Sequence, residues 1–164
     1  MARRPRSNKR HIMLIEIPGE PQSDARPRAA RIGGFIKFYD CKAKEKQIVK
    51  KFLMCEIATQ LKDFPIEVHS ITFGTSFSIK FEFYMPIPQS WSEKKRQNAH
   101  LQKIPHTVKP DIDNLSKFYL DCMNKIIYHD DSQITNLLAQ KSYSLVPKTV
   151  ILILSNGGKI NGKS

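Results

Sequence analysis

Two pairs of aspartates stand out in a chain that is otherwise rich in basic residues. One is Asp111-Ile112-Asp113 and the other is Asp130-Asp131. Residues two apart in an extended segment project to the same side, so Asp111 and Asp113 are expected to present two carboxylates together. Gathered carboxylates repel each other unless a cation neutralises them. Hard oxygen ligands without cysteine or organised histidine suit Mg²⁺ or Mn²⁺, and such a metal polarises a phosphodiester and activates bound water.

A helix and the segment that returns from it must bring the two acidic pairs together. A helix from Asp113 to about Lys125 rises roughly 18–20 Å at about 1.5 Å per residue. The return to Asp131, if extended, covers roughly 20 Å at about 3.3 Å per residue. Because the two lengths match, Asp131 is expected to end beside Asp111 and Asp113. Lys117 lies on the same helix face as Asp113, one turn along, so three or four carboxylates and one ammonium are expected to converge.

Each of these features also has a purely structural explanation. Asp113 can cap a helix, Asp113 and Lys117 can form an ordinary surface ion pair, and Asp130-Asp131 can belong to a turn. Taken singly, these explanations are the commoner ones. The matched geometry in a strongly basic chain favours the metal site over all of them together.

The apolar pattern around these motifs indicates an α+β fold. Alternation of apolar and polar residues predicts strands at 12–17, 35–39, 66–73, 77–85, about 135–143 and about 149–154. One helix is expected from an N-cap at Asp40 to about Leu61 with Ile48, Phe52, Cys55 and Leu61 on its apolar face, and a second at about 113–124. We therefore predict a single domain over 11–155, a mixed sheet of five to six strands with two main helices, flanked by a basic flexible arm at 1–10 and a flexible tail at 156–164.

The charge balance of the chain indicates a polyanionic partner. The 164 residues include 27 Lys and Arg against 15 Asp and Glu, a formal net charge of +12, with a pI near 9.7. Such an excess favours nucleic acid or an acidic membrane surface as the partner. The longest apolar run, residues 150–154, is far shorter than the roughly 20 residues of a membrane-spanning helix. A membrane-spanning protein is thereby excluded.

Cysteine usage and the N-terminal segment predict a cytoplasmic location. The three cysteines are unclustered and form no CxxC pair, which argues against a disulfide framework or a zinc knuckle and fits a reducing compartment. The apolar stretch after the basic N-terminus is broken by Glu16 and stopped by Pro18, so it is too short for the core of a signal peptide.

Four ordered blocks of sequence resemble the RusA-type Holliday junction resolvases, from about residue 17 to 154. The central block is KPDIDNLSK at 109–117, followed by Leu120-Asp121 and then by DDSQ at 130–133. The upstream blocks are GEP at 19–21 with RPR at 26–28, and PQSWSEKKR at 88–96. One departure is Lys125, where the family often has glycine. We expect Asn124 to take the left-handed position at the helix end instead.

The resemblance implies a homodimeric, Mg²⁺-dependent crossover junction endodeoxyribonuclease of recombination and repair, often encoded by prophages, in which Mn²⁺ can substitute. It implies metal-binding catalytic roles for Asp111, Asp113 and Asp131, and an essential basic role for Lys117. Asp130 is a second-rank candidate for the metal. The substrate is branched DNA in the form of a four-way junction. Two-fold symmetry supplies the two matched nicks that resolving a junction requires.

Basic residues outside the acidic motifs are expected to contact DNA phosphates without reading bases. The candidates are Arg26, Arg28, Lys94, Lys95, Arg96 and Lys109. Trp91 and Phe83 are weaker candidates for stacking at the centre of a junction. The main alternative to a nuclease is a non-catalytic basic protein that binds branched DNA and whose acids only shape the fold.

Overall fold

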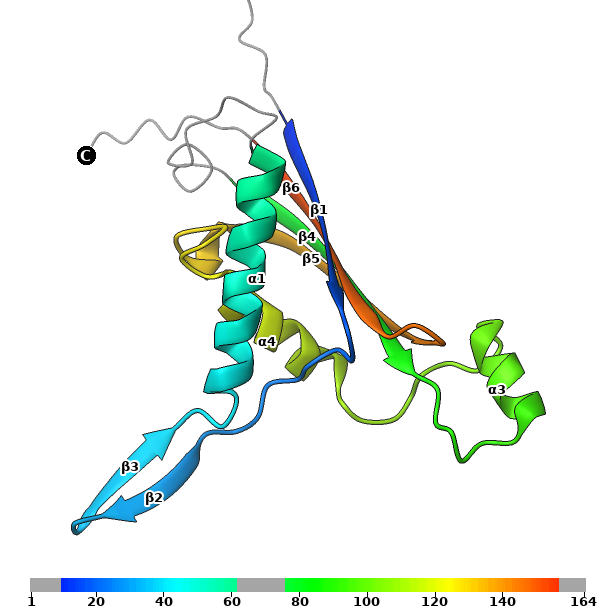
Figure 1. The fold of residues 1–164 in the computed structure, drawn as a ribbon. Coiled ribbons are helices and arrows are strands. Elements are labelled where there is room, and N and C mark those ends of the chain that lie inside the picture. The colour runs from blue at the N-terminus through cyan, green and yellow to red at the C-terminus, as the bar shows by residue number, and fades with distance from the viewer. Residues whose placement is uncertain (1–9, 62–75, 157–164) are drawn as a thin grey trace, which may run out of the picture.

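A computed structural model describes residues 10–61 and 76–156 of the chain. Six strands and three α-helices occupy these residues (Figure 1), so the predicted α+β single-domain fold is confirmed. The strand expected at 66–73 lies outside the described residues, as do the proposed arm and tail apart from their innermost residues. None of the helices in the described part of the chain is long and apolar enough to cross a membrane.

The main sheet has four strands in the order β1-β6-β4-β5. β4 (Ser76–Pro86) is central. It pairs antiparallel with β6 (Lys148–Asn156) and parallel with β5 (Ile134–Ser144), while β1 (Arg10–Pro18) closes the other edge against β6. Alternate residues of β4 are buried, as the sequence predicts. They are Phe77, Ile79, Phe81, Phe83 and Met85. Phe83 is therefore a core residue, and it cannot stack on DNA.

Two helices, α1 (Ala43–Leu61) and α4 (Ile112–Met123), contact each other and pack on the main sheet. The bounds of α4 agree with the prediction to one residue, and its buried side includes Leu115, Phe118 and Tyr119. Because the apolar residues of α4 recur every three to four positions, one face enters the core. Asp113 and Lys117 thus lie on a helix that packs firmly on the core.

The buried face of α1 differs from the predicted one. Val49, Leu53 and Ile57 are buried, whereas Ile48 is 69% exposed and Cys55 is also exposed. The helix carries two overlapping apolar stripes of i, i+3 and i+4 spacing. Sequence periodicity does not decide which stripe faces the sheet.

A separate hairpin, β2 (Arg28–Ile32) and β3 (Phe35–Tyr39), projects away from the main sheet below α1 (Figure 1). Gly33 and Gly34 connect the two strands with φ values of +57° and +87°. Positive φ at both loop positions is what a tight two-residue β-turn requires, and glycine adopts it without steric cost. The sequence analysis predicted β3 but missed β2, whose strand is polar and arginine-bearing.

A third helix, α3 (Glu93–His100), follows β4 and lies at the right of the view, away from α1 and α4 (Figure 1). The sequence analysis gave this segment no structure because it is polar. Ala99 is nevertheless buried with Ile87 and Tyr143, and Trp91 packs on this small cluster with its ring 5.1 Å from that of Tyr143. Trp91 is therefore a packing residue, which is the more common role for a tryptophan beside the end of a strand.

Candidate active site on helix α4

The start of α4 separates the first pair of aspartates. Asp111 is the N-cap residue with extended backbone (φ −72°, ψ 147°), whereas Asp113 lies in the first helical turn. The alternation rule that would place both carboxylates on one side applies to extended backbone, so it does not hold across this boundary. Both side chains are exposed.

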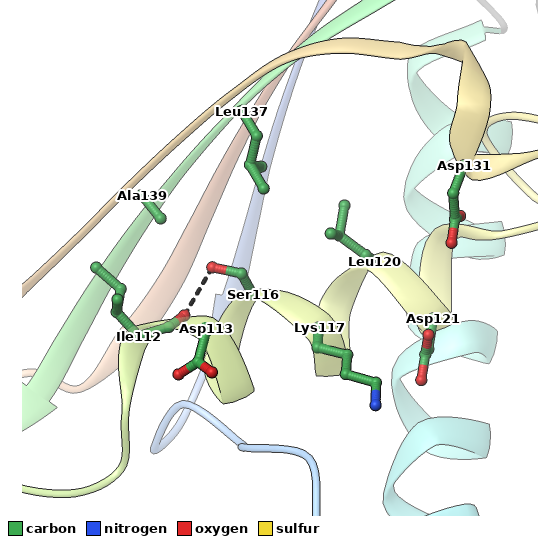
Figure 2. A pocket seen from close by; sticks show the side chains of 9 residues that line it. All are labelled: Ile112, Asp113, Ser116, Lys117, Leu120, Asp121, Asp131, Leu137 and Ala139. Carbon is green, nitrogen blue, oxygen red and sulfur yellow. Dashed lines mark hydrogen bonds between the residues drawn. The ribbon is translucent and has the colours of Figure 1, made fainter.

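A pocket of about 420 Å³ runs along α4 beneath β5 (Figure 2). Asp113, Lys117 and Asp121 line it from successive turns of the helix, and Asp131 lines it from the segment between α4 and β5. The remaining lining residues are Ile112, Ser116, Leu120, Leu137 and Ala139. Three acids and one ammonium thus share an apolar-walled pocket, while Asp111 lies outside the lining.

Asp131 lies at the end of the pocket near Asp121, and Asp113 lies at the other end (Figure 2). Asp113 and Asp121 are eight positions apart on one helix, which corresponds to about 12 Å. The predicted extended return is wrong, because residues 125–127 form a turn in which the Lys125 N–H donates to the Tyr128 carbonyl at 2.8 Å. Residues in a turn span less distance than extended residues, so this segment does not carry Asp131 back to Asp111 as expected.

The electrostatics of Asp131 differ from those of Asp130. Burial raises the pKa of Asp131, and the negative charges of Asp121 and Asp130 raise it further. Its Oδ1 accepts a hydrogen bond from Asn124 Nδ2 at 3.1 Å. Asp130 instead caps the short 3-10 helix η1 (Asp131–Gln133), where the N–H of Ser132 donates to it at 2.9 Å. Hydrogen bonds from the side chain and the N–H of Ser132 lower the pKa of Asp130. Asp130 therefore has the turn-forming role that the sequence analysis left open.

A hub of ion pairs joins the pocket to the rest of the molecule. Lys46 Nζ of α1 lies 2.9 Å from Asp24 Oδ1, 3.0 Å from Asp40 Oδ2 and 2.9 Å from Asp121 Oδ2. Burial acts to lower the pKa of Lys46, but its hydrogen bonds to the three carboxylates outweigh burial and raise it. Asp24 also lies 3.5 Å from Lys117 Nζ. Lys46 thus holds together α1, α4 and the segment that leads into the hairpin.

The predicted DNA-contacting residues lie on both sides of α4. Arg26 and Arg28 are exposed where the chain enters the hairpin, and Lys109 is exposed just before α4. On α3, Lys94 is exposed and Lys95 Nζ lies 3.8 Å from the centre of the Trp91 ring. Arg96 is the exception, because it is half-buried and its Nε is enclosed by protein. A DNA strand that crosses α4 would meet cations on either flank.

Comparison with known proteins identifies the lineage. Residues 18–154 match the family model described as endodeoxyribonuclease RusA. The chain belongs to the RusA endodeoxyribonuclease family. It is 35% identical over 137 residues to the uncharacterized protein YqaN of Bacillus subtilis (strain 168), covering 84% of this chain and 92% of that one. It is 28% identical over 128 residues to the crossover junction endodeoxyribonuclease rusA of Lactococcus phage r1t, covering 77% and 84% of the two chains.

One departure from the RusA pattern is visible in the backbone. Lys125 lies at the position where RusA-family proteins often have glycine, and it has φ +65°. Asn124 has φ −59°. The expectation that Asn124 would take the left-handed conformation is therefore wrong. Lys125 takes it, and its ammonium is held by the carbonyl of His129. A left-handed conformation costs a residue with a Cβ about 1–2 kcal/mol.

Lys125→Gly is therefore expected to raise the free energy of unfolding by about 0.5 kcal/mol. Relief of the left-handed strain exceeds the roughly 0.4–1 kcal/mol that glycine adds to the entropy of the unfolded chain. Urea unfolding followed by circular dichroism measures the change. Asn124→Gly serves as the control and is expected to destabilise the protein, because it gains no strain relief and loses the bond to Asp131. A less stable Lys125→Gly protein would contradict this account of the turn.

Proposed function

We propose that this RusA-family protein is a divalent-metal-dependent endonuclease that cuts branched DNA, with four-way junctions as its preferred substrate. The observation that carries the proposal is the pocket on α4, which is lined by Asp113, Lys117 and Asp131 of the family pattern. Exposed basic residues lie on α3 and where the chain enters the hairpin. We further propose that it acts as a homodimer in recombination and repair, because resolving a junction takes two matched nicks. Its three free cysteines agree with a cytoplasmic setting.

The donor set of the pocket fits Mg²⁺ or Mn²⁺. Asp113, Asp121 and Asp131 supply hard carboxylate oxygens, and neither histidine nor cysteine lines the pocket. Among residues 10–61 and 76–156, no three acidic, histidine or cysteine side chains form a ready-made metal cluster. Mg²⁺ does not need one, since it is usually held by one or two carboxylates together with waters and substrate phosphates. When bound, the metal supplies an activated water and stabilises the leaving oxygen.

In this proposal Asp113 and Asp131 lie at the two ends of the pocket and each would hold a divalent metal together with waters and substrate phosphate oxygens. Asp111 at the N-cap and Asp130 are additional candidate carboxylates. Burial raises the pKa of Asp131, and the negative charges of Asp121 and Asp130 raise it further. A bound cation would relieve this concentration of negative charge. Lys117 offers an exposed ammonium between the acids of the pocket. A cation at this place steadies negative charge on the scissile phosphate.

The test of the proposal is a cleavage assay on a synthetic four-way junction. We expect the purified protein to cut the junction when Mg²⁺ is present, to stop when the metal is chelated, and to leave a linear duplex of the same sequence largely intact. Binding is expected to weaken steeply with added salt, because phosphate contacts displace counterions. Tight junction binding without cutting in either Mg²⁺ or Mn²⁺ would favour the non-catalytic DNA-binding alternative.

Lys117→Ala is expected to lower the single-turnover rate of junction cutting by about 10²–10³-fold, the scale of losing one group that stabilises charge in the transition state. Junction affinity should change by only a few-fold. Lys94→Ala, on the exposed face of α3, is the matched control and should weaken binding without changing the rate at saturation. The reverse pattern for Lys117 would make it a binding residue.

A further inference from the structure

The β2–β3 hairpin exposes an unusual amount of apolar surface. Phe35 is 81% exposed, Phe38 70% and Ile36 67%, and Tyr39 at the base is 47% exposed. Single exposed apolar residues are common on protein surfaces, but neighbouring large ones on a projecting element mark an interaction site. A two-stranded hairpin without a covered face is only marginally stable in water. We therefore expect a binding partner to cover the apolar surface of the hairpin.

The hairpin places cations beside its aromatic rings. Residues that lie directly opposite each other in an antiparallel pair share one face, and the observed register pairs Arg28 with Tyr39, Ala29 with Phe38, and Arg31 with Ile36. Lys37 lies on the same face as Phe35 and Tyr39, because side chains alternate along a strand. The whole hairpin contains three cations and no acidic residue. They are Arg28, Arg31 and Lys37.

The base of the hairpin is anchored to the catalytic helix. In the segment before β2, the N–H of Asp24 donates to the carbonyl of Asn114 at 2.9 Å, and the Asp24 carboxylate pairs with Lys46 and Lys117. Directly after β3, Asp40 pairs with Lys46 at 3.0 Å. Both ends therefore meet at Lys46 of α1, and the bond to Asn114 ties the start of the hairpin segment to α4.

Charge decides which partner fits this surface. A second copy of the chain docked hairpin to hairpin would bring three cations of one copy against three of the other, with no acidic residue on either hairpin to pair them. DNA offers the complementary chemistry, because phosphates pair with the cations and base faces stack on aromatic rings. At a branch point, bases lose their stacking neighbours and present such faces.

We propose that the β2–β3 hairpin is an arm that binds the branch point of the DNA substrate, with Phe35 and Phe38 stacking on bases and Arg28, Arg31 and Lys37 contacting phosphates. The inference rests on the proposed function, which supplies branched DNA as the ligand. It assigns the stacking role to residues that the sequence analysis passed over. The aromatic residues considered there, Phe83 and Trp91, are held in the core and in the cluster beside α3.

The test compares a double substitution, Phe35→Ser with Phe38→Ser, against the wild-type protein in the absence of divalent metal. Affinity is measured for a four-way junction and for a linear duplex of the same sequence, and mass is measured by light scattering. We expect junction affinity to fall at least ten-fold, duplex affinity to change less than two-fold, and mass to stay the same, since stacking contributes substantially for each base. Val146→Ser is the matched control, because Val146 is 69% exposed on a loop far from the hairpin in sequence.

A second variant separates stacking from simple apolar contact. Replacing both phenylalanines by leucine keeps an apolar side chain on the strand but removes the ring, so junction affinity should again fall about ten-fold. A reduced mass for the serine variant that leucine restores would overturn the proposal in favour of a contact between two copies. Unchanged junction affinity in both variants would overturn it as well. If the wild-type protein itself showed no preference for the junction, the proposed function would fail first, and the two failures are thereby distinguished.

Discussion

Asp113→Asn is expected to leave a folded protein that binds a four-way junction but no longer cuts it. Asparagine has nearly the same shape as aspartate, and the side chain is exposed in the first turn of α4, so the fold has no reason to change. The substitution removes one of the carboxylate charges that line the pocket. Loss of a carboxylate that holds the metal should lower the cutting rate by at least about 10²–10³-fold, comparable to losing an electrostatic group of an active site.

Single-turnover cleavage and gel-shift binding measure the two effects in parallel. Glu16→Gln is the matched control, because Glu16 is an exposed acid on β1 whose ion pair with Lys148 lies outside the pocket. It should cut at the wild-type rate. Cutting retained by Asp113→Asn would remove this residue from the mechanism. A large loss of binding would instead indicate that Asp113 organises the DNA surface.

Lys46→Met is expected to lower the free energy of unfolding by about 2–3 kcal/mol, more than the loss of an ordinary surface ion pair. Methionine preserves the length of the side chain but leaves Asp24, Asp40 and Asp121 without the cation that they share. Breaking a buried ion pair by removing one partner costs about 3–5 kcal/mol. The expected value is lower because two of the three carboxylates are more than a third exposed and therefore partly screened.

Chemical unfolding in urea measures this loss, and Lys148→Met provides the control. Lys148 makes an ion pair with the exposed Glu16 at 2.9 Å, so its removal should cost at most about 1 kcal/mol. Adding Asp121→Asn to Lys46→Met should recover part of the stability, because it removes one of the repelling charges. Equal losses for the two lysine variants would show that the Lys46 hub contributes no more than an ordinary surface pair.

Much of the fold follows from the apolar pattern of the sequence. The alternation of phenylalanines in β4 and the helical spacing in α4 locate these elements because each buries one face, which is what periodicity reports. β2 and α3 were missed because neither buries a face: β2 is stabilised by pairing with β3, and α3 buries little beyond Ala99. The buried face of α1 was assigned wrongly because its two apolar stripes have the same helical spacing. Only packing against the sheet decides which stripe is buried.

The site was predictable where it depends on local spacing. Asp113 and Lys117 share a pocket, as their separation by one helical turn predicts. The position of Asp131 was not predictable, because it depends on the compact turn at Lys125 and on the bond from Tyr128 Oη to the Leu120 carbonyl. The role of Lys46 depends on partners far away in the sequence, Asp121 above all. No spacing rule reports such a contact.

The central claim is that the pocket on α4 holds a divalent metal, and mapping that metal on the polypeptide tests it most directly. Fe²⁺ can replace Mg²⁺ in sites of hard oxygen ligands, and with ascorbate and peroxide it cuts the backbone close to where it is bound. The account predicts fragments that end within 111–121 and 130–139, which excess Mg²⁺ suppresses and Asp113→Asn diminishes. Cleavage confined to other segments, or none that Mg²⁺ suppresses, would contradict it.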